Sequence, residues 1–128
     1  MAKIVHIEDE KAFRLVVKDA LKKIQGLNLI QISDLESFFG LDELSSDLYI
    51  MDRHFPEKPG QKAGDTSWRK IAEFVRDFYP ETPIILLSGA IPRNWRDYTS
   101  IRYAVPKRPF SSQNLYSIVE SIINGGEK

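Results

Sequence analysis

Acidic, hydroxyl and basic side chains stand directly after short apolar runs in this sequence. They are Glu8, Asp9, Asp52, Ser88, Lys107 and Arg108. Carboxylates gathered in one pocket raise each other's pKa, and a bound divalent cation reverses that effect. An oxygen-only site of this kind suits Mg²⁺, which commonly bridges to a phosphate. A hydroxyl and a cation beside it are suited to hold phosphoryl oxygens, so these residue types indicate phosphoryl transfer.

Alternating elements are needed to bring these residues together. Runs typical of strands lie at Lys3–Ile7, Leu27–Ile32, Leu48–Met51, Ile84–Leu87 and Tyr103–Val105. The regions between most of them show apolar residues at helical spacing. Five strands alternating with helices predict an α/β fold, with a parallel sheet covered on both faces. Ligands of such sheets bind at the carboxyl ends of the strands, which is where the six residues lie.

The helical segments differ in clarity. An apolar series from Phe13 to Ile24 predicts a first helix that stops at Gly26, and Leu35–Leu41 reads as a short second helix. A third helix is indicated by an apolar stripe at Trp68, Ile71, Val75 and Phe78, of which we expect Trp68 and Phe78 to lie in the core. The last helix is indicated by Leu115, Ile118, Val119 and Ile122, and Gly125 and Gly126 should end it. Between the fourth and fifth strands, Pro92–Arg102 allows at most a short helix around Trp95–Tyr98.

Composition is that of an ordinary globular protein. The 128 residues fit one domain, 1–128, and 18 basic residues balance 18 acidic ones. Because direct nucleic-acid binding usually needs a basic excess, none is expected. No apolar run approaches the roughly 20 residues of a membrane span. The chain has no Cys, which is compatible with the cytoplasmic location that we expect.

Four motifs in order resemble those of response-regulator receiver domains, the phosphoacceptor domains of two-component signal transduction. IVHIEDE resembles the acidic-pair motif, and LYIMDRHFPEKPG resembles the phosphorylation-site motif. IILLSG resembles the fourth-strand motif, and VPKRPF resembles the Lys-Pro motif before the last helix. The resemblance covers the whole chain and is to single-domain receivers like the chemotaxis regulators. It implies a flavodoxin-like, doubly wound sheet in the order 2-1-3-4-5, with a short or irregular fourth helix here.

The resemblance also implies roles for individual residues. Asp52 would accept a phosphoryl group from a histidine kinase or phosphotransfer protein. The protein would catalyse its own phosphorylation and dephosphorylation, but it would be a signalling phosphoacceptor and not an enzyme. Mg²⁺ would be held by Asp9, Asp52 and the backbone carbonyl of His54, with Glu8 acting through a water. Ser88 would hydrogen-bond the phosphoryl group. Phosphorylation would then change affinity for a downstream protein partner that the sequence does not identify.

One position of the family pattern is ambiguous. The family places its Lys directly before the Pro, which here gives Arg108, whereas a one-residue insertion gives Lys107. Successive strand side chains point to opposite sides, so only one of the two is expected to face the site, and we favour Lys107. The interval from Ser88 to this pair is also short for the family. That shortness, with Pro92 inside the interval, is the reason for expecting a reduced fourth helix.

Two other features have open interpretations. The loop Glu57–Asp65 is long for the family, and it either covers the pocket, contacts a kinase or is a plain surface insertion. His54 either modulates water attack on the acyl phosphate or is simply solvated, whereas His6 within an apolar strand is expected to be a core residue.

The sequence also has features that bear on three other functions. A pseudo-receiver, which would bind a partner without phosphorylation, is the main alternative because the Lys107 region and the fourth helix are altered. A phosphate-ester hydrolase would need an acid two residues after Asp52, where His54 stands. A nucleotide-binding domain would need a Gly-rich loop after the first strand, which this sequence lacks.

Overall fold

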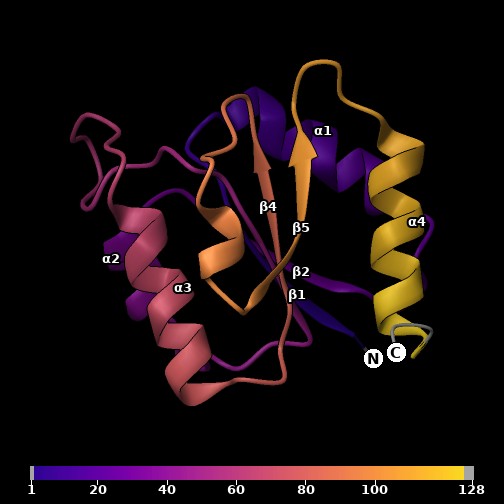
Figure 1. Ribbon diagram of the computed structural model, residues 1–128. Coiled ribbons are helices and arrows are strands. Elements are labelled where there is room, and N and C mark those ends of the chain that lie inside the picture. The colour runs from indigo at the N-terminus through magenta and orange to yellow at the C-terminus, as the bar shows by residue number, and fades with distance from the viewer. Residues whose placement is uncertain (1, 126–128) are drawn as a thin grey trace.

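The computed structural model describes residues 2–125 and shows a central sheet between two helical layers (Figure 1). Within these residues the sheet has five strands in the order β2-β1-β3-β4-β5, and every neighbouring pair is parallel. The strands are β1 Lys3–Ile7, β2 Asn28–Ile32, β3 Leu48–Met51, β4 Ile84–Ser88 and β5 Ile101–Pro106. Every residue of β3 and β4 is buried, as expected of inner strands covered on both faces.

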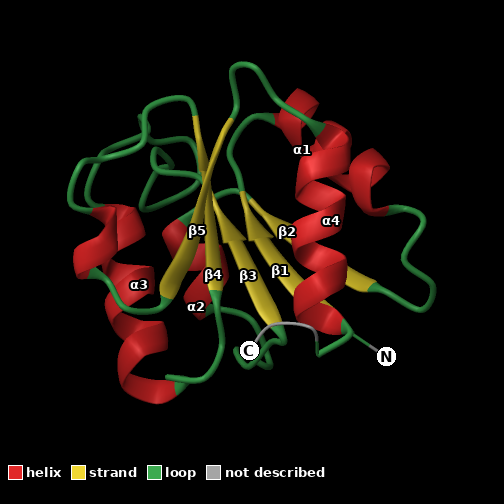
Figure 2. Ribbon diagram, turned by 45° about the vertical axis from the view of Figure 1, so that its right-hand side comes forward, coloured by secondary structure: helices red, strands yellow, loops and turns green. Residues whose placement is uncertain are grey.

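Helices cover both faces of this sheet. On one face lie α1 (Lys11–Leu21) and α4 (Ser112–Ile123), and on the other lie α2 (Leu35–Phe39) and α3 (Ser67–Phe78) (Figure 2). Alternate residues of each strand therefore enter two separate cores: Val5 and Ile7 pack toward α2 and α3, whereas Ile4 packs toward α1 and α4. None of the described helices has the length and apolar character to cross a membrane.

The predicted fold class is confirmed, including the strand order and the reduced fourth helix. The segment between β4 and β5 contains only η1, a three-residue 3₁₀ turn at Trp95–Asp97. Trp95 is half-buried and packs against the α2–α3 core, together with Tyr98. His6 is fully buried, and its Nδ1 lies 3.1 Å from Gln31 Nε2, so the prediction of a core histidine is also confirmed.

Two predictions about helices are wrong in detail. The first helix ends at Leu21, because the Ile24 amide donates to the Leu21 carbonyl in a turn that brings Ile24 to the core without helical continuation. Phe78 was expected in the core but is 67% exposed. Tyr79 leaves helical geometry after α3 and packs against the core in its place, stacking edge-on with Phe74 at 5.8 Å. Gly125, the predicted stop of the last helix, has φ +72°, while Gly126 lies outside the described residues.

Candidate functional site

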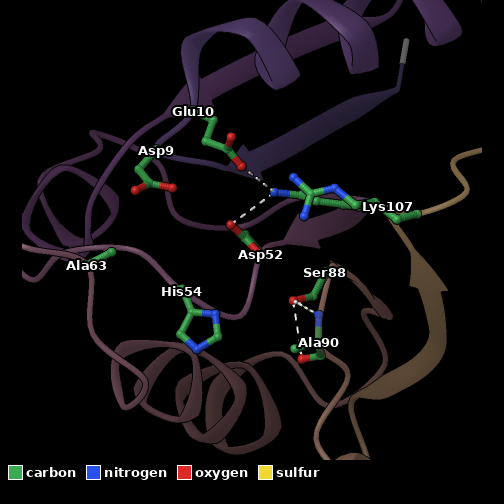
Figure 3. A pocket seen from close by; sticks show the side chains of 10 residues that line it. Asp9, Glu10, Asp52, His54, Ala63, Ser88, Ala90 and Lys107 are labelled. Atoms are coloured by element: carbon green, nitrogen blue, oxygen red, sulfur yellow. Dashed lines mark hydrogen bonds and ion pairs between the residues drawn. The ribbon is translucent and has the colours of Figure 1, made fainter.

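A pocket of about 380 Å³ opens at the carboxyl ends of β1, β3, β4 and β5 (Figure 3). The residues around this Asp52 pocket are Asp9, Glu10, Asp52, His54, Ala63, Ser88, Gly89, Ala90, Lys107 and Arg108. Ladder hydrogen bonds that continue past the strand ends hold its frame. The Asp52 amide donates to the Ile7 carbonyl at 3.0 Å, and the Lys107 amide donates to the Ser88 carbonyl at 3.0 Å.

Three carboxylates converge at the centre of this frame. Glu8, Glu10 and Asp52 each offer one oxygen, and these oxygens all lie within 4.8 Å of one another. Asp52 is buried, and its Oδ1 accepts a hydrogen bond from the Arg53 amide at 2.7 Å. Such an all-oxygen donor set is the chemistry that hard divalent cations prefer.

Glu8 is the most deeply placed of the three, with none of its surface exposed. One of its oxygens, Oε2, accepts a hydrogen bond from the Glu10 amide at 3.1 Å. Burial, with the negative charge of Asp52 as a second cause, raises the pKa of Glu8 to about 8. Burial and the nearby charge of Asp52 therefore both favour the protonated form of Glu8.

Lys107 supplies the cation among these groups. Its Nζ lies 2.8 Å from Glu8 Oε1 and 3.2 Å from both Glu10 Oε1 and Asp52 Oδ2. The side chain is 9% exposed, and the ammonium also lies 4.6 Å from the centre of the Phe13 ring. Although burial lowers the pKa of Lys107, its contacts with Glu8, Asp52 and Glu10 outweigh that effect and raise the pKa, so the ammonium stays charged.

An irregularity in β5 places Lys107, and not Arg108, at this position. Ile84 pairs with Ile101, but Ile85 pairs with Tyr103, so Arg102 is an extra residue in the ladder. A one-residue shift exchanges the two sides of a strand, and the shift here corresponds to the one-residue insertion considered from the sequence. Arg108 still lines the pocket, on the side of Gly89.

The remaining predicted residues also lie at the pocket. Asp9 points into it from the β1–α1 turn, and burial together with the Asp52 charge raises the Asp9 pKa (Figure 3). Ser88 is buried, and its Oγ makes only long contacts, 3.3 Å from the Ala90 amide and 3.4 Å from the Ala90 carbonyl. The His54 ring lies across the pocket from Lys107, with Nε2 3.6 Å from Asp65 Oδ1.

Two contributors were missed from the sequence. Glu10 was not considered a site residue, yet its carboxylate reaches Lys107 from the N-cap of α1. Arg53 was not considered, although its guanidinium joins the long loop to the segment after β4. The acidic run Glu8-Asp9-Glu10 was the available signal for Glu10, whereas no local pattern identifies the partners of Arg53.

Comparison with solved structures places this architecture among receiver domains. The signal receiver domain of an HD-domain protein from Pseudomonas fluorescens aligns with a TM-score of 0.75 and 19% identity, covering 97% of this chain and 95% of that one. The BeF₃-activated DrrB receiver domain gives 0.76 and 20%, with coverages of 97% and 98%. A signal receiver domain of a two-component histidine kinase from Clostridium thermocellum gives 0.75 and 20%, with coverages of 94% and 96%.

Sequence comparison alone does not reach these proteins. No protein-family model matches the chain, and no curated protein matches it. The protein has the fold of the response-regulator receiver domain, which is the fold of signalling domains of two-component systems. The resemblance drawn from the four motifs is thus confirmed at the level of the fold.

Proposed function

We propose that this protein is a receiver whose Asp52 accepts a phosphoryl group from a phosphohistidine on a histidine kinase or phosphotransfer protein. The observation that carries the proposal is the position of Asp52. Its carboxylate is held at a strand end beside the Lys107 ammonium, 3.2 Å away, in an open pocket that a phosphoryl donor can enter. A carboxylate oxygen of Asp52 attacks phosphorus, the bond from phosphorus to the histidine nitrogen breaks, and that nitrogen keeps the electron pair.

The surrounding side chains fit this transfer. Lys107 is positioned to pair with a phosphoryl oxygen, and a charge-assisted contact of this kind is about twice as strong as a neutral hydrogen bond. Ser88 Oγ has only long contacts with Ala90 at 3.3 and 3.4 Å, so it can turn to donate to the phosphoryl group at little cost. The Arg53 amide already points at Asp52 and can donate to an oxygen there.

The carboxylates fit a Mg²⁺ ion as the partner of this reaction. Glu8, Glu10 and Asp52 bring three carboxyl groups together around one lysine, Lys107. Glu8, Asp9 and Asp52 would hold the ion with the His54 carbonyl, and Glu10 is a further carboxylate in reach. Bound there, Mg²⁺ would neutralise charge on the phosphoryl oxygens as they transfer.

Phosphorylation would act by shifting the balance between two conformers and so changing affinity for a downstream protein. We propose this for residues 1–128 as one domain, acting in the cytoplasm. The three-residue η1 replaces a longer helix at the surface next to Ser88, so the surface that changes on phosphorylation differs from that of a receiver with a full fourth helix.

Acetyl phosphate tests the phosphoacceptor directly. With Mg²⁺, the intact mass of the wild type should rise by one phosphoryl group, and Asp52→Asn should show no such gain. Ser88→Ala is a matched variant at the neighbouring strand end, and it should retain the adduct while forming it more slowly. No adduct on the wild type, or an equal adduct on Asp52→Asn, would refute the proposal. Partner binding in the absence of any adduct would identify a pseudo-receiver.

A further inference from the structure

A side-chain clamp next to Asp52 holds the long loop Glu57–Asp65 in place. The Arg53 guanidinium makes a two-pronged contact with Asp65, with Nε 2.7 Å from Oδ1 and Nη2 2.9 Å from Oδ2. Its third contact runs from Nη1 to the Ala90 carbonyl at 2.9 Å. One side chain thereby joins the residue after the phosphoacceptor, the end of the loop and the segment after Ser88.

The far side of the loop is anchored independently. Glu57 pairs with Lys70 of α3 at 2.9 Å, and its carbonyl accepts from the Glu36 amide at 2.8 Å. These contacts do not involve any residue that lines the Asp52 pocket. Of these two side-chain anchors of the loop, only the Arg53 clamp lies beside the phosphoacceptor.

The loop contributes a wall to the pocket through Ala63. This residue lines the Asp52 pocket two positions before Asp65, and His54 lines the same pocket (Figure 3). Backbone pairing between Phe55 and Gly64 closes the base of the loop, with a long hydrogen bond of 3.4 Å. Since that pairing is weak, the position of Ala63 depends chiefly on the Arg53–Asp65 contact.

From these contacts we propose that Arg53 and Asp65 are positioning residues that keep the loop wall against the Asp52 pocket and so prolong the lifetime of the aspartyl phosphate. This inference rests on the proposed function. In the reaction that is slowed, a water oxygen bonds to phosphorus while the bond from phosphorus to the Asp52 oxygen breaks. Asp52 leaves with the electron pair as a carboxylate, and the water's protons go to hydrogen phosphate and to solvent.

Releasing the wall exposes phosphorus to bulk water. An ion pair that is partly exposed, as this one is, holds its geometry by a modest free energy, so its loss should accelerate hydrolysis about fivefold. Because both residues act through one contact, Arg53→Gln and Asp65→Asn should each produce that change, and the double variant should add nothing further. Asp65→Glu, which keeps the carboxylate, should restore most of the lifetime.

The test follows loss of the adduct by intact mass after the acetyl phosphate is removed. Lys70→Gln is the matched control, since it breaks an ion pair of the same loop away from the pocket, and its lifetime should stay within about twofold of the wild type. Unchanged lifetimes in both clamp variants would overturn the inference. The inference would also be overturned if Asp65→Asn alone shortened the lifetime, which would point to the Asp65–His54 contact. An equally shortened lifetime in Lys70→Gln would overturn it as well.

A second measurement does not depend on phosphorylation. Lys62 is exposed and directly precedes Ala63, so tryptic cleavage at this bond reports release of the wall. Arg53→Gln and Asp65→Asn should be cut there severalfold faster than the wild type and Lys70→Gln, with thermal unfolding showing that all variants are folded. Equal cleavage rates would overturn the clamp itself. If the wild type forms no adduct but the two clamp variants are still cleaved faster than the wild type, the proposed function is overturned and the clamp stands.

Discussion

The buried carboxyl group of Glu8 should make the folding stability fall as the pH rises above neutrality. With burial and the charge of Asp52 raising its pKa to about 8, the folded protein holds a proton that the unfolded chain, with an ordinary value of 4.5, has lost. A group with a raised folded pKa stabilises the native state below its unfolded pKa, and that stabilisation disappears as the pH passes the folded value. Glu8→Gln keeps the shape and removes the titration.

The size of the effect follows from these values. Between pH 7 and pH 9, Glu8 in the folded state goes from about nine-tenths to about one-tenth protonated, which costs roughly 1.4 kcal/mol of unfolding free energy. His6 acts in the opposite direction because burial lowers its pKa to about 3 from 6.5. The His6 contribution is nearly complete by pH 7, and only about 0.2 kcal/mol of it falls within this window. The interval from pH 7 to pH 9 therefore isolates Glu8.

Urea unfolding in EDTA at pH 7, 8 and 9 measures this difference. The wild type should lose about 1.4 kcal/mol more than Glu8→Gln across the interval, because His6 contributes equally to both proteins. Excess Mg²⁺ should abolish the decline in the wild type, because cation binding favours the carboxylate form. Parallel curves for the two proteins without Mg²⁺ would refute the reasoning, since they would show that Glu8 is ionised throughout.

Two further predictions compare matched variants. Lys107→Ala should slow formation of the Asp52 adduct from acetyl phosphate at least about tenfold, because it removes the buried cation beside the carboxylate, whereas Arg108→Ala should change the rate by about twofold or less; small and equal effects would contradict this assignment. Phe38→Ala should lower the unfolding free energy by about 3 kcal/mol or more because the ring is fully buried, and Phe78→Ala should lower it by less than about 1 kcal/mol because Phe78 is mostly exposed. Urea denaturation distinguishes the two, and similar losses would contradict the placement of these rings.

The sheet could be predicted from the sequence because its inner strands carry an unambiguous signal. The runs Leu48–Met51 and Ile84–Leu87 carry no charged residue and are buried at every position, as strands covered on both faces must be. The alternation of strands and helices then determines the class of fold. Since the carboxyl ends of parallel strands meet at one edge, the residues after them could be grouped into one candidate site from the sequence alone.

What could not be predicted depends on contacts between distant segments. The spacing of α3 defines a face but not how far the neighbouring layer extends, so Phe78 was wrongly assigned to the core. The bulge at Arg102 depends on pairing between β4 and β5, and no local pattern around Lys107 reveals it. The clamp from Arg53 to Asp65 likewise joins residues 12 apart whose meeting depends on the shape of the loop.

The bulge at Arg102 also changes the outer edge of the sheet. β5 is an edge strand of the sheet, and a flat, regular edge offers unpaired backbone groups to a strand from another molecule. An extra residue twists such an edge, the exposed Arg102 adds charge to it, and Pro106 at the end of β5 lacks an amide to donate. The irregularity that turns Lys107 toward Asp52 therefore also makes this edge a poor template for aggregation.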